Sequence, residues 1–244
     1  MRELLEGARR AARAAAVAIM EVYKSPFDVR KKADASPVTE ADERAEAIII
    51  EILAKLAPEI PIIAEEMAER GLPQTAARFW LVDPLDGTRE FVAKNGEFTT
   101  NIGLIAGDRA VLGVIHLPVT EVTYAAAGIG TATRQEQDSG PVPIAARPVP
   151  ASGAVIAHSR SHANNAQLAA YVAGIPHAQK RIGGSAAKFC LVAEGSADLY
   201  PRFGPTMEWD TAAGQAIVEA AGGSVTTFDG APLRYAKPGF RNPE

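Results

Sequence analysis

The chain has 244 residues, of which 47% are hydrophobic and 22% are charged. This composition is typical of a soluble globular protein and excludes a disordered or fibrous chain. Its 25 Lys and Arg residues against 29 Asp and Glu residues give a net charge of −4. We therefore do not expect a nucleic-acid polymer as a partner, because its phosphates require a basic surface.

Cysteine and histidine usage limits the chemistry of any metal site. Cys190 is the single cysteine, so no internal disulfide is expected and a reducing compartment is favoured. One cysteine and four histidines do not supply a zinc site of the usual spacing. We expect any metal to be held by carboxylates, the ligands that a hard cation such as Mg²⁺ prefers.

No stretch of the sequence is long and apolar enough to predict a transmembrane segment. The apolar run 14–20 follows three arginines, but it is too short for a signal peptide and no cleavage site follows it. A surface amphipathic helix is the favoured interpretation. We expect a cytoplasmic protein and leave peripheral attachment to the inner face of the membrane open.

The first half of the chain predicts two helices followed by a largely antiparallel sheet. Apolar residues recur at helical spacing over residues 3–23 and again from Ala41 to Leu56. Thr39 is expected to cap the second helix, with Asp42 three residues later in a capping-box pattern. Short apolar runs separated by Gly and Pro then predict strands over residues 60–64, 78–82, 99–105, 111–117 and 121–126.

The second half alternates strand and helix patterns, which predicts helices packed on a sheet. The stretch 128–150 is rich in Thr, Gln, Gly and Pro and is the expected boundary between two subdomains, 1–133 and 134–244. The predicted strands cover residues 154–158, 180–182, 197–200 and 224–228, and the predicted helices cover 164–173, 185–193 and 211–221.

The segment Asp83-Pro84-Leu85-Asp86-Gly87-Thr88 carries the strongest chemical signal. An apolar strand ends with Asp83 at a sheet edge. Asp86 adds a second carboxylate about one turn later. Gly87 permits an unusual backbone angle and close approach of a ligand. The amides of Gly87 and Thr88 are then placed to bind an anion, as at a helix start. Together these features predict a site for a divalent cation and a phosphate.

Three other segments carry candidate partners for these carboxylates. Glu65 and Glu66 follow an apolar run, which by itself is typical of a solvated acidic loop. Asp210 follows Trp209 at a predicted helix start, where an acid is often only a cap. Asp42 alone would be an ordinary acid in the first turn of a helix. Their order along the chain, with the hexapeptide between them, is what makes them informative.

This order resembles the lithium-sensitive, Mg²⁺-dependent phosphomonoesterase superfamily that includes inositol monophosphatases and fructose bisphosphatases. Within it, the sequence is most similar to the 3'(2'),5'-bisphosphate nucleotidases of the CysQ type. The resemblance implies an α+β fold, a layered α/β/α/β/α sandwich with the active site between its halves. The motifs that carry it are Ser36-Pro37-Val38-Thr39-Glu40-Ala41-Asp42, residues 80–88, Asn95-Gly96-Glu97-Phe98-Thr99, Ser159-Arg160-Ser161-His162, Lys188-Phe189-Cys190 and Trp209-Asp210.

The resemblance implies a metal site and a catalytic dyad. Carboxylates and one carbonyl are expected to bind two or three Mg²⁺ ions, for which Mn²⁺ substitutes and which Li⁺ inhibits. Thr88 is expected to orient the attacking water with Asp42 accepting from its hydroxyl, while Glu65 faces the same water and metal activation supplies most of the effect. The implied metal ligands are Glu65, Asp83, the carbonyl of Leu85, Asp86 and Asp210.

The resemblance also implies which residues hold the substrate. The reacting phosphate is expected on the amides of Gly87 and Thr88. Lys188 and Arg202 supply cations for a second phosphate, and His162 is expected to contact the base or sugar, although it could equally be a surface residue. Ser185 completes the implied nucleotide site. Lys188 lies in an apolar run and best distinguishes a nucleotidase from an inositol monophosphatase.

The leading hypothesis is a hydrolase that converts 3'-phosphoadenosine 5'-phosphate, a by-product of sulfate assimilation, to AMP and phosphate. The 5'-phosphosulfate form is a second candidate substrate. The alternative is an inositol or sugar-phosphate monophosphatase with the same metal site. A catalytically silent nucleotide-binding protein and an RNA-binding module are both disfavoured, and monomer and homodimer remain open.

Overall fold

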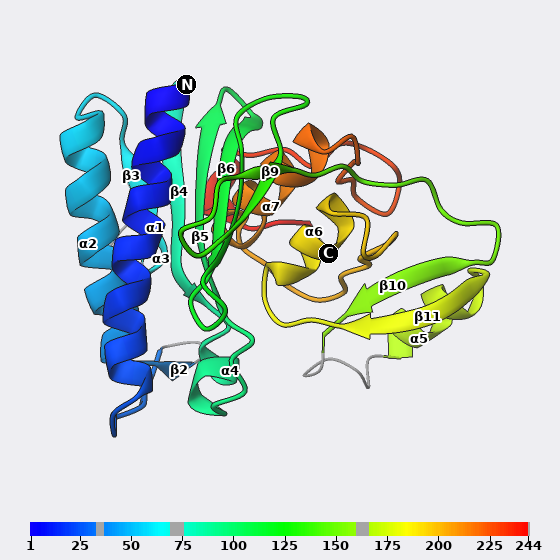
Figure 1. Cartoon of the computed structure of the whole chain (residues 1–244), viewed down its shortest axis with the longest axis horizontal. Coiled ribbons are helices and arrows are strands. Elements are labelled where there is room, and N and C mark those ends of the chain that lie inside the picture. The colour runs from blue at the N-terminus through cyan, green and yellow to red at the C-terminus, as the bar shows by residue number, and fades with distance from the viewer. Residues whose placement is uncertain (33–36, 69–75, 160–165, 244) are drawn as a thin grey trace.

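The computed structural model describes residues 1–32, 37–68, 76–159 and 166–243. Figure 1 shows their elements arranged in five layers: a pair of helices, a large sheet, a second pair of helices, a small sheet and a last helix. This arrangement confirms the α+β class and the layered α/β/α/β/α sandwich.

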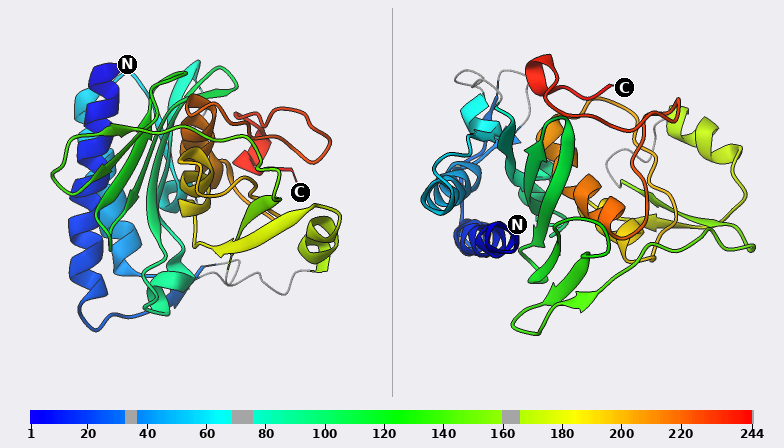
Figure 2. Two further views of the ribbon diagram at one scale, coloured as in Figure 1. Left: turned by 45° about the vertical axis from the view of Figure 1, so that its right-hand side comes forward. Right: turned by 90° about the horizontal axis from the view of Figure 1, so that it is seen from above.

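The first layer consists of α1 (Arg2–Tyr23) and α2 (Glu40–Leu56). They cover one face of the large sheet, as the view from above in Figure 2 shows. The buried face of α1 is rich in alanine, so the two helices and the sheet approach closely. The predicted capping box is present, since Asp42 accepts a hydrogen bond from the Thr39 amide, and Thr39 in turn accepts from the Ala41 amide.

The large sheet confirms the predicted antiparallel meander. Its first two strands are parallel and all later neighbours are antiparallel. In spatial order the strands are β3 (Ile62–Ala64), β4 (Arg78–Asp86), β5 (Thr99–Ala106), β6 (Arg109–Leu117), β7 (Val122–Ala126), β8 (Thr133–Glu136) and β9 (Val142–Pro143). Strands β8 and β9 continue this sheet past residue 133. The division into subdomains 1–133 and 134–244 stays a prediction.

Three short features flank the sheet and were not predicted. Helix α3 (Glu65–Ala68) follows β3, and α4 (Thr88–Val92) follows β4. Strands β1 (Arg30–Lys31) and β2 (Pro37–Val38) pair with each other below the sheet. Each has five residues or fewer, too short to leave a periodic hydrophobic pattern in the sequence.

The third layer consists of α6 (Ala187–Ala193) and α7 (Glu208–Ala220), which pack on the other face of the sheet. Two glycines explain how closely α7 approaches. Gly103 and Gly113 are register partners on β5 and β6. A Cβ on Gly113 would lie 2.2 Å from the carbonyl oxygen of Ala213. The absence of side chains here therefore fixes α7, and with it Asp210, against the sheet.

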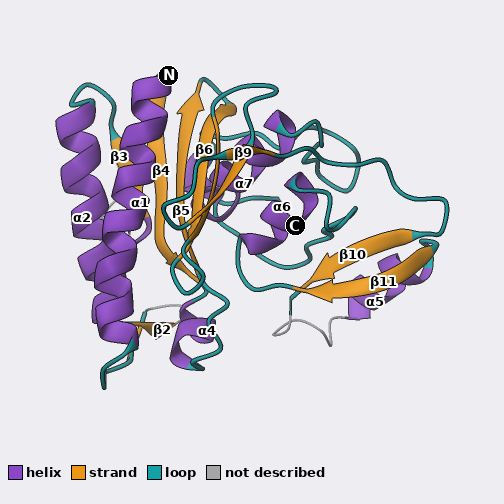
Figure 3. Cartoon of the chain, viewed as in Figure 1, coloured by secondary structure: helices purple, strands orange, loops and turns teal. Residues whose placement is uncertain are grey.

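The outer layers hold the small sheet of β10 (Ala154–His158) and β11 (His177–Ile182), which are parallel, and helix α5 (Ala166–Ala173). The predicted strands 197–200 and 224–228 were wrong, and Figure 3 shows long loops in this part of the chain. Each segment makes a single bridge, Leu199 to Ile156 and Thr226 to Pro232. Pro201 and Pro232 lack the amide that a continuing ladder needs.

A short 3-10 turn, Pro238–Phe240, lies near the C-terminal end. Among the helices of the described ranges, we find none with the length and apolar character required to cross a bilayer.

Candidate active site

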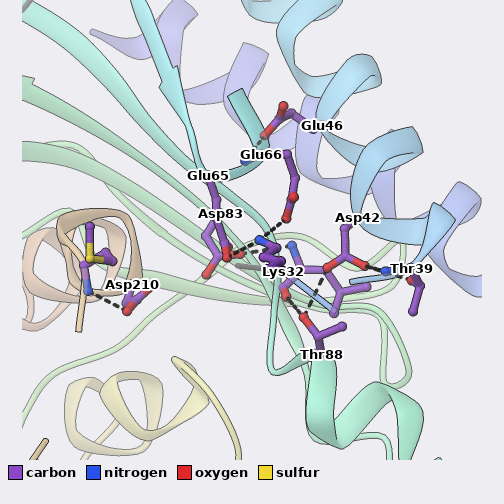
Figure 4. A network of polar contacts seen from close by, with 11 residues as sticks. Lys32, Thr39, Asp42, Glu46, Glu65, Glu66, Asp83, Thr88 and Asp210 are labelled. Atoms are coloured by element: carbon purple, nitrogen blue, oxygen red, sulfur yellow. Dashed lines mark hydrogen bonds and ion pairs between the residues drawn. The ribbon is translucent and has the colours of Figure 1, made fainter. Parts of the chain in front are cut away.

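Two acidic residues lie side by side because β3 and β4 are parallel and in register. Ala64 is the register partner of Val82. The residues that follow this pair, Glu65 at the start of α3 and Asp83 on β4, are therefore carried to the same end of the two strands. Figure 4 shows both side chains at this end, and they lie within hydrogen-bonding reach of each other.

A bulge in β4 then brings Asp86 to the same end. The register with β5 shifts between Asp83 and Asp86, so the two intervening residues leave the ladder. Asp83 Oδ1 accepts a hydrogen bond from the Leu85 amide at 3.1 Å. Thr100 Oγ1 donates to the Pro84 carbonyl at 2.9 Å. These bonds fix the bulge between the two carboxylates.

Asp86 joins the sheet to the second pair of helices. Its Oδ2 accepts from Ala186, the residue before α6, at 2.6 Å and from Asn101 Nδ2 at 3.3 Å. The sequence did not predict Asn101, although its place on the strand that pairs with β4 follows from the meander. With Oδ2 held by both partners, the carboxylate of Asp86 has a fixed orientation.

Asp210 approaches from α7, on the other side of the site in Figure 4. It is the third residue of that helix, and its Oδ2 accepts from the Met207 amide at 2.8 Å. It therefore does cap its helix, as its position in the sequence suggested. It also lies close enough to Glu65 and Asp86 for their negative charges to act on it.

The predicted pair of Asp42 and Thr88 is present. Thr88 Oγ1 lies 3.1 Å from Asp42 Oδ1 and 3.3 Å from the Leu85 carbonyl, so its hydrogen is shared by two acceptors. Asp42 Oδ2 accepts from the Thr39 amide and hydroxyl, both at 2.8 Å. Burial raises the pKa of Asp42, and the hydrogen bonds from Thr39 reduce that rise. The capping box of α2 thus also orients the residue that holds Thr88.

The acidic residues destabilise one another when all are ionised. Burial raises the pKa of Asp83 well above its usual value, and the charges of Glu65, Asp86 and Asp210 raise it further. Burial, followed by the charges of Asp86 and Glu65, does the same to Asp210. A buried group of like charges requires positive charge to stay ionised.

Lys32 supplies one such charge, and sequence reasoning missed it. Its Nζ donates to Glu65 Oε1 at 2.8 Å and to Glu66 Oε1 at 2.6 Å, and its side chain is only 5% exposed. Burial acts to lower the pKa of Lys32, but Glu65 and Glu66 outweigh it and the net shift is upward. Burial raises the pKa of Glu66 to about 7. The signal was the basic run Arg30-Lys31-Lys32 shortly before the Ser36-Pro37 motif.

Replacing Lys32 by Met should destabilise the metal-free protein by about 3 kcal/mol, since a buried ion pair would lose one partner. Urea unfolding in EDTA measures this, and Lys31→Met is the control because Lys31 is exposed. Mg²⁺ should restore more stability to Lys32→Met than to the control. Equal stability of the two variants in EDTA would contradict this assignment.

The donor set fits a hard divalent cation. The candidate ligands offer only carboxylate and carbonyl oxygen, the chemistry that Mg²⁺ prefers. Their mutual repulsion is relieved by cations, as the ammonium group of Lys32 illustrates. Within the described ranges, no three Asp, Glu, His or Cys side chains are gathered around one point tightly enough to form a finished metal site. The assignment of Glu65, Asp83, Leu85, Asp86 and Asp210 as ligands stays a prediction.

Stability should depend on pH in a way that reports on these acids. The folded pKa values of Glu66, Asp83, Asp86 and Asp210 lie above their unfolded values, so the metal-free fold loses stability as the pH rises from about 5 to about 7. His116 opposes this trend, because burial lowers its pKa to about 4. Mg²⁺ binds the ionised acids, so the rise in Tm on adding Mg²⁺ should be larger at pH 7 than at pH 5. Equal increments at both pH values would contradict the prediction.

A cavity of about 770 Å³ opens beside these acids. Its lining includes the candidate metal ligands Asp86 and Asp210 together with four of the six predicted substrate residues, Gly87, Ser185, Lys188 and Arg202. Of the other two, Thr88 does not line the cavity and His162 lies outside the described residues. The structure therefore brings two of the candidate metal ligands and four of the predicted substrate residues to one space, while Asp42, Glu65 and Thr88 do not line it.

Gly87 has the left-handed backbone that the sequence suggested, with φ of 95°, and it precedes α4. A Cβ there would lie 2.1 Å from Ser185 Oγ, so the loop before α6 rests directly on Gly87. Ser185 Oγ donates to the Glu97 carbonyl at 3.0 Å. Position 87 thus requires glycine for two reasons: its φ is positive, and Ser185 leaves no room for a Cβ.

Lys188 is almost fully buried, which a solvated helix lysine would not be. Its Nζ donates to the carbonyls of Ser185 at 2.6 Å and Gly183 at 3.3 Å and lies 5.1 Å from the ring centre of Tyr200. Burial lowers its pKa to about 8, although the charge of Asp86 opposes the shift. Lys188 therefore shapes the loop before α6 in addition to any contact with substrate.

The chain belongs to the inositol monophosphatase family, whose model matches residues 1–243. Enzymes of this family use divalent metal ions, typically Mg²⁺. The fold, the buried acids and the cavity agree with this membership.

Within the family, the chain can be compared with nucleotidases and with an inositol monophosphatase. The chain is 48% identical to the 3'(2'),5'-bisphosphate nucleotidase CysQ of Shigella flexneri, over 94% of this chain and 95% of that one. The crystal structure of CysQ from Bacteroides thetaiotaomicron superimposes with a TM-score of 0.81 at 36% identity, covering 98% and 94% of the two chains. An inositol monophosphatase from Anabaena matches less well, with a TM-score of 0.75 at 28% identity, covering 97% and 88%.

Proposed function

We propose that this chain is a 3'(2'),5'-bisphosphate nucleotidase that removes the 3'-phosphate of 3'-phosphoadenosine 5'-phosphate, giving AMP and phosphate. The observation that carries the proposal is the 48% identity to a CysQ nucleotidase over 94% of the chain. The acidic site and the adjoining cavity supply the machinery that such a reaction needs.

Bound divalent cations would neutralise the phosphate and make a bound water a better nucleophile at neutral pH. Thr88 donates its hydrogen to Asp42 and Leu85. The oxygen of this hydroxyl then accepts a hydrogen bond from the attacking water and orients the water towards the phosphate. The amides of Gly87 and Thr88, at the start of α4, hold the phosphate oxygens.

Glu65 is the third residue that we assign to the attacking water. It lies at the carboxyl end of β3, next to Asp83, and its Oε1 accepts from Lys32. Thr88 and Asp42 act mainly by positioning, because a threonine hydroxyl is a weak base. We further propose that two or three Mg²⁺ ions bind, that Mn²⁺ replaces them and that Li⁺ inhibits.

The remaining phosphate of the substrate is assigned to Lys188 and Arg202, which line the cavity beside Asp86. Two of the three N–H groups of the Lys188 ammonium point to carbonyls, and we assign the third to the anion. An inositol monophosphate has a single phosphate group and gains nothing from this second cationic position. This difference favours the nucleotide over the alternative, an inositol or sugar phosphate.

Initial rates of phosphate release with Mg²⁺ test the proposal. We expect kcat/KM for 3'-phosphoadenosine 5'-phosphate to exceed that for inositol 1-phosphate by at least about tenfold, the worth of one good ionic contact. Asp83→Asn, purified in parallel, controls for contaminating phosphatases. Faster turnover of inositol 1-phosphate would overturn the proposal in favour of the alternative.

A further inference from the structure

Three aromatic rings from separate segments meet beside the cavity. Tyr171 lies in α5, Phe203 lies in the loop before α7, and Phe228 lies in the loop after α7. Their ring centres are 4.4 to 5.8 Å apart, and the rings of Phe203 and Phe228 are nearly parallel, with an interplanar angle of 18°. The right-hand view of Figure 2 shows the loop after α7 reaching towards α5.

These rings are not part of a buried core. Tyr171 is 42% exposed and Phe228 is 49% exposed, whereas Phe79, Phe91 and Phe98 are at most 1% exposed. Flat apolar surface left in water at this level is unfavourable, so a ligand that covers it would gain free energy.

The exposed rings line the same cavity as two of the candidate metal ligands. Tyr171 and Phe228 line it together with Asp86 and Asp210. Phe203 stacks on Phe228 and supports it. A volume of about 770 Å³ is within the range that encloses a small organic ligand.

We infer that Tyr171 and Phe228, backed by Phe203, form a stacking platform for the purine base of the nucleotide. The inference rests on the proposed function. A nucleoside bisphosphate has three chemically distinct parts: a reacting phosphate, a second phosphate and a flat aromatic base. The cavity has acids for cations, the cationic pair Lys188 and Arg202, and these rings. Every base has a flat π-face, which stacks well on aromatic side chains.

Equilibrium binding separates the base from the rest of the ligand. AMP and ribose 5-phosphate differ by the base, so the ratio of their Kd values measures what the base contributes. Titration calorimetry in Mg²⁺ should give AMP about tenfold tighter binding to the unmodified chain. Phe228→Leu should reduce this ratio to near one, and Phe228→Tyr, which keeps a ring, should preserve it. Ile129→Ser, at a residue that is 91% exposed and does not line the cavity, is the surface control.

Kinetics provide the second readout. Phe228→Leu and Tyr171→Leu should raise KM for 3'-phosphoadenosine 5'-phosphate about tenfold and leave KM for inositol 1-phosphate unchanged. An equal loss for both substrates would assign the rings a structural role and overturn the inference, as would an unchanged AMP to ribose 5-phosphate ratio in Phe228→Leu. If the unmodified chain releases no phosphate from the nucleotide, the proposed reaction fails, while the binding ratio still decides the base platform.

Discussion

Replacing Asp83 by Asn should abolish phosphate release, lowering kcat by at least about 10³-fold, because several kcal/mol of charge stabilisation would be lost with one metal ligand. Asp83 is buried at the carboxyl end of the β4 ladder, beside Glu65 and opposite Asn101. A neutral amide keeps the shape of the side chain but removes one of the charges that attract a divalent cation.

The same substitution should not weaken the metal-free fold. The pKa of Asp83 is raised by burial and by neighbouring acids, so its charge opposes folding at neutral pH. Asp83→Asn should therefore unfold in EDTA at the same Tm as the unmodified chain or at a higher one, while its stabilisation by Mg²⁺ is largely lost. Asp138→Asn, at an exposed loop residue, is the matched control. Retained turnover in Asp83→Asn would rule out Asp83 as a ligand.

Gly87→Ala should lower kcat by about 10²-fold, the cost expected when reacting groups are displaced by about 1 Å. The new methyl group would lie 2.1 Å from Ser185 Oγ in a backbone with φ of 95°. Relief of that clash moves the loop whose next residue, Ala186, holds Asp86. The variant thus disturbs a candidate ligand and the phosphate-binding amides together.

Gly107→Ala is the control for the backbone term alone. Gly107 has φ of 63°, and a Cβ there would meet nothing within 4 Å. Both variants should lose roughly 1–2 kcal/mol of stability from the left-handed backbone, but only Gly87→Ala should lose activity. Wild-type turnover in Gly87→Ala would refute the role assigned to this glycine.

Local signals in the sequence predicted the parts of the fold that depend on local chemistry. Thr39 and Asp42, which are three residues apart, predicted the start of α2, and both hydrogen bonds of that capping box are present. The first five strands of the meander, β3 to β7, were predicted to within a few residues of their ends, whereas β8 and β9 fall in the stretch 128–150 and were not predicted. The predicted strands 197–200 and 224–228 do not form, because Pro201, directly after the first, and Pro232, the bridge partner of Thr226, have no amide to extend a ladder.

The geometry of the site could be predicted only in part, because it depends on non-local pairing. The register of Ala64 with Val82 carries Glu65 to Asp83, and nothing near either residue in the sequence encodes it. The close approach of α7, which places Asp210, depends on two glycines from different strands. The acids were grouped through their order along the chain and the resemblance to a family, whereas Lys32, which has no such motif, was missed.

Diffraction from crystals soaked in Mn²⁺, with data collected at the manganese absorption edge, tests the central claim most directly. The claim is that Glu65, Asp83, Asp86 and Asp210 bind divalent cations beside Thr88. It predicts at least one anomalous peak with carboxylate oxygens of these residues within about 2.0–2.3 Å, the distance typical of a small divalent cation. Anomalous density only elsewhere, with no peak beside these four side chains, would contradict the account.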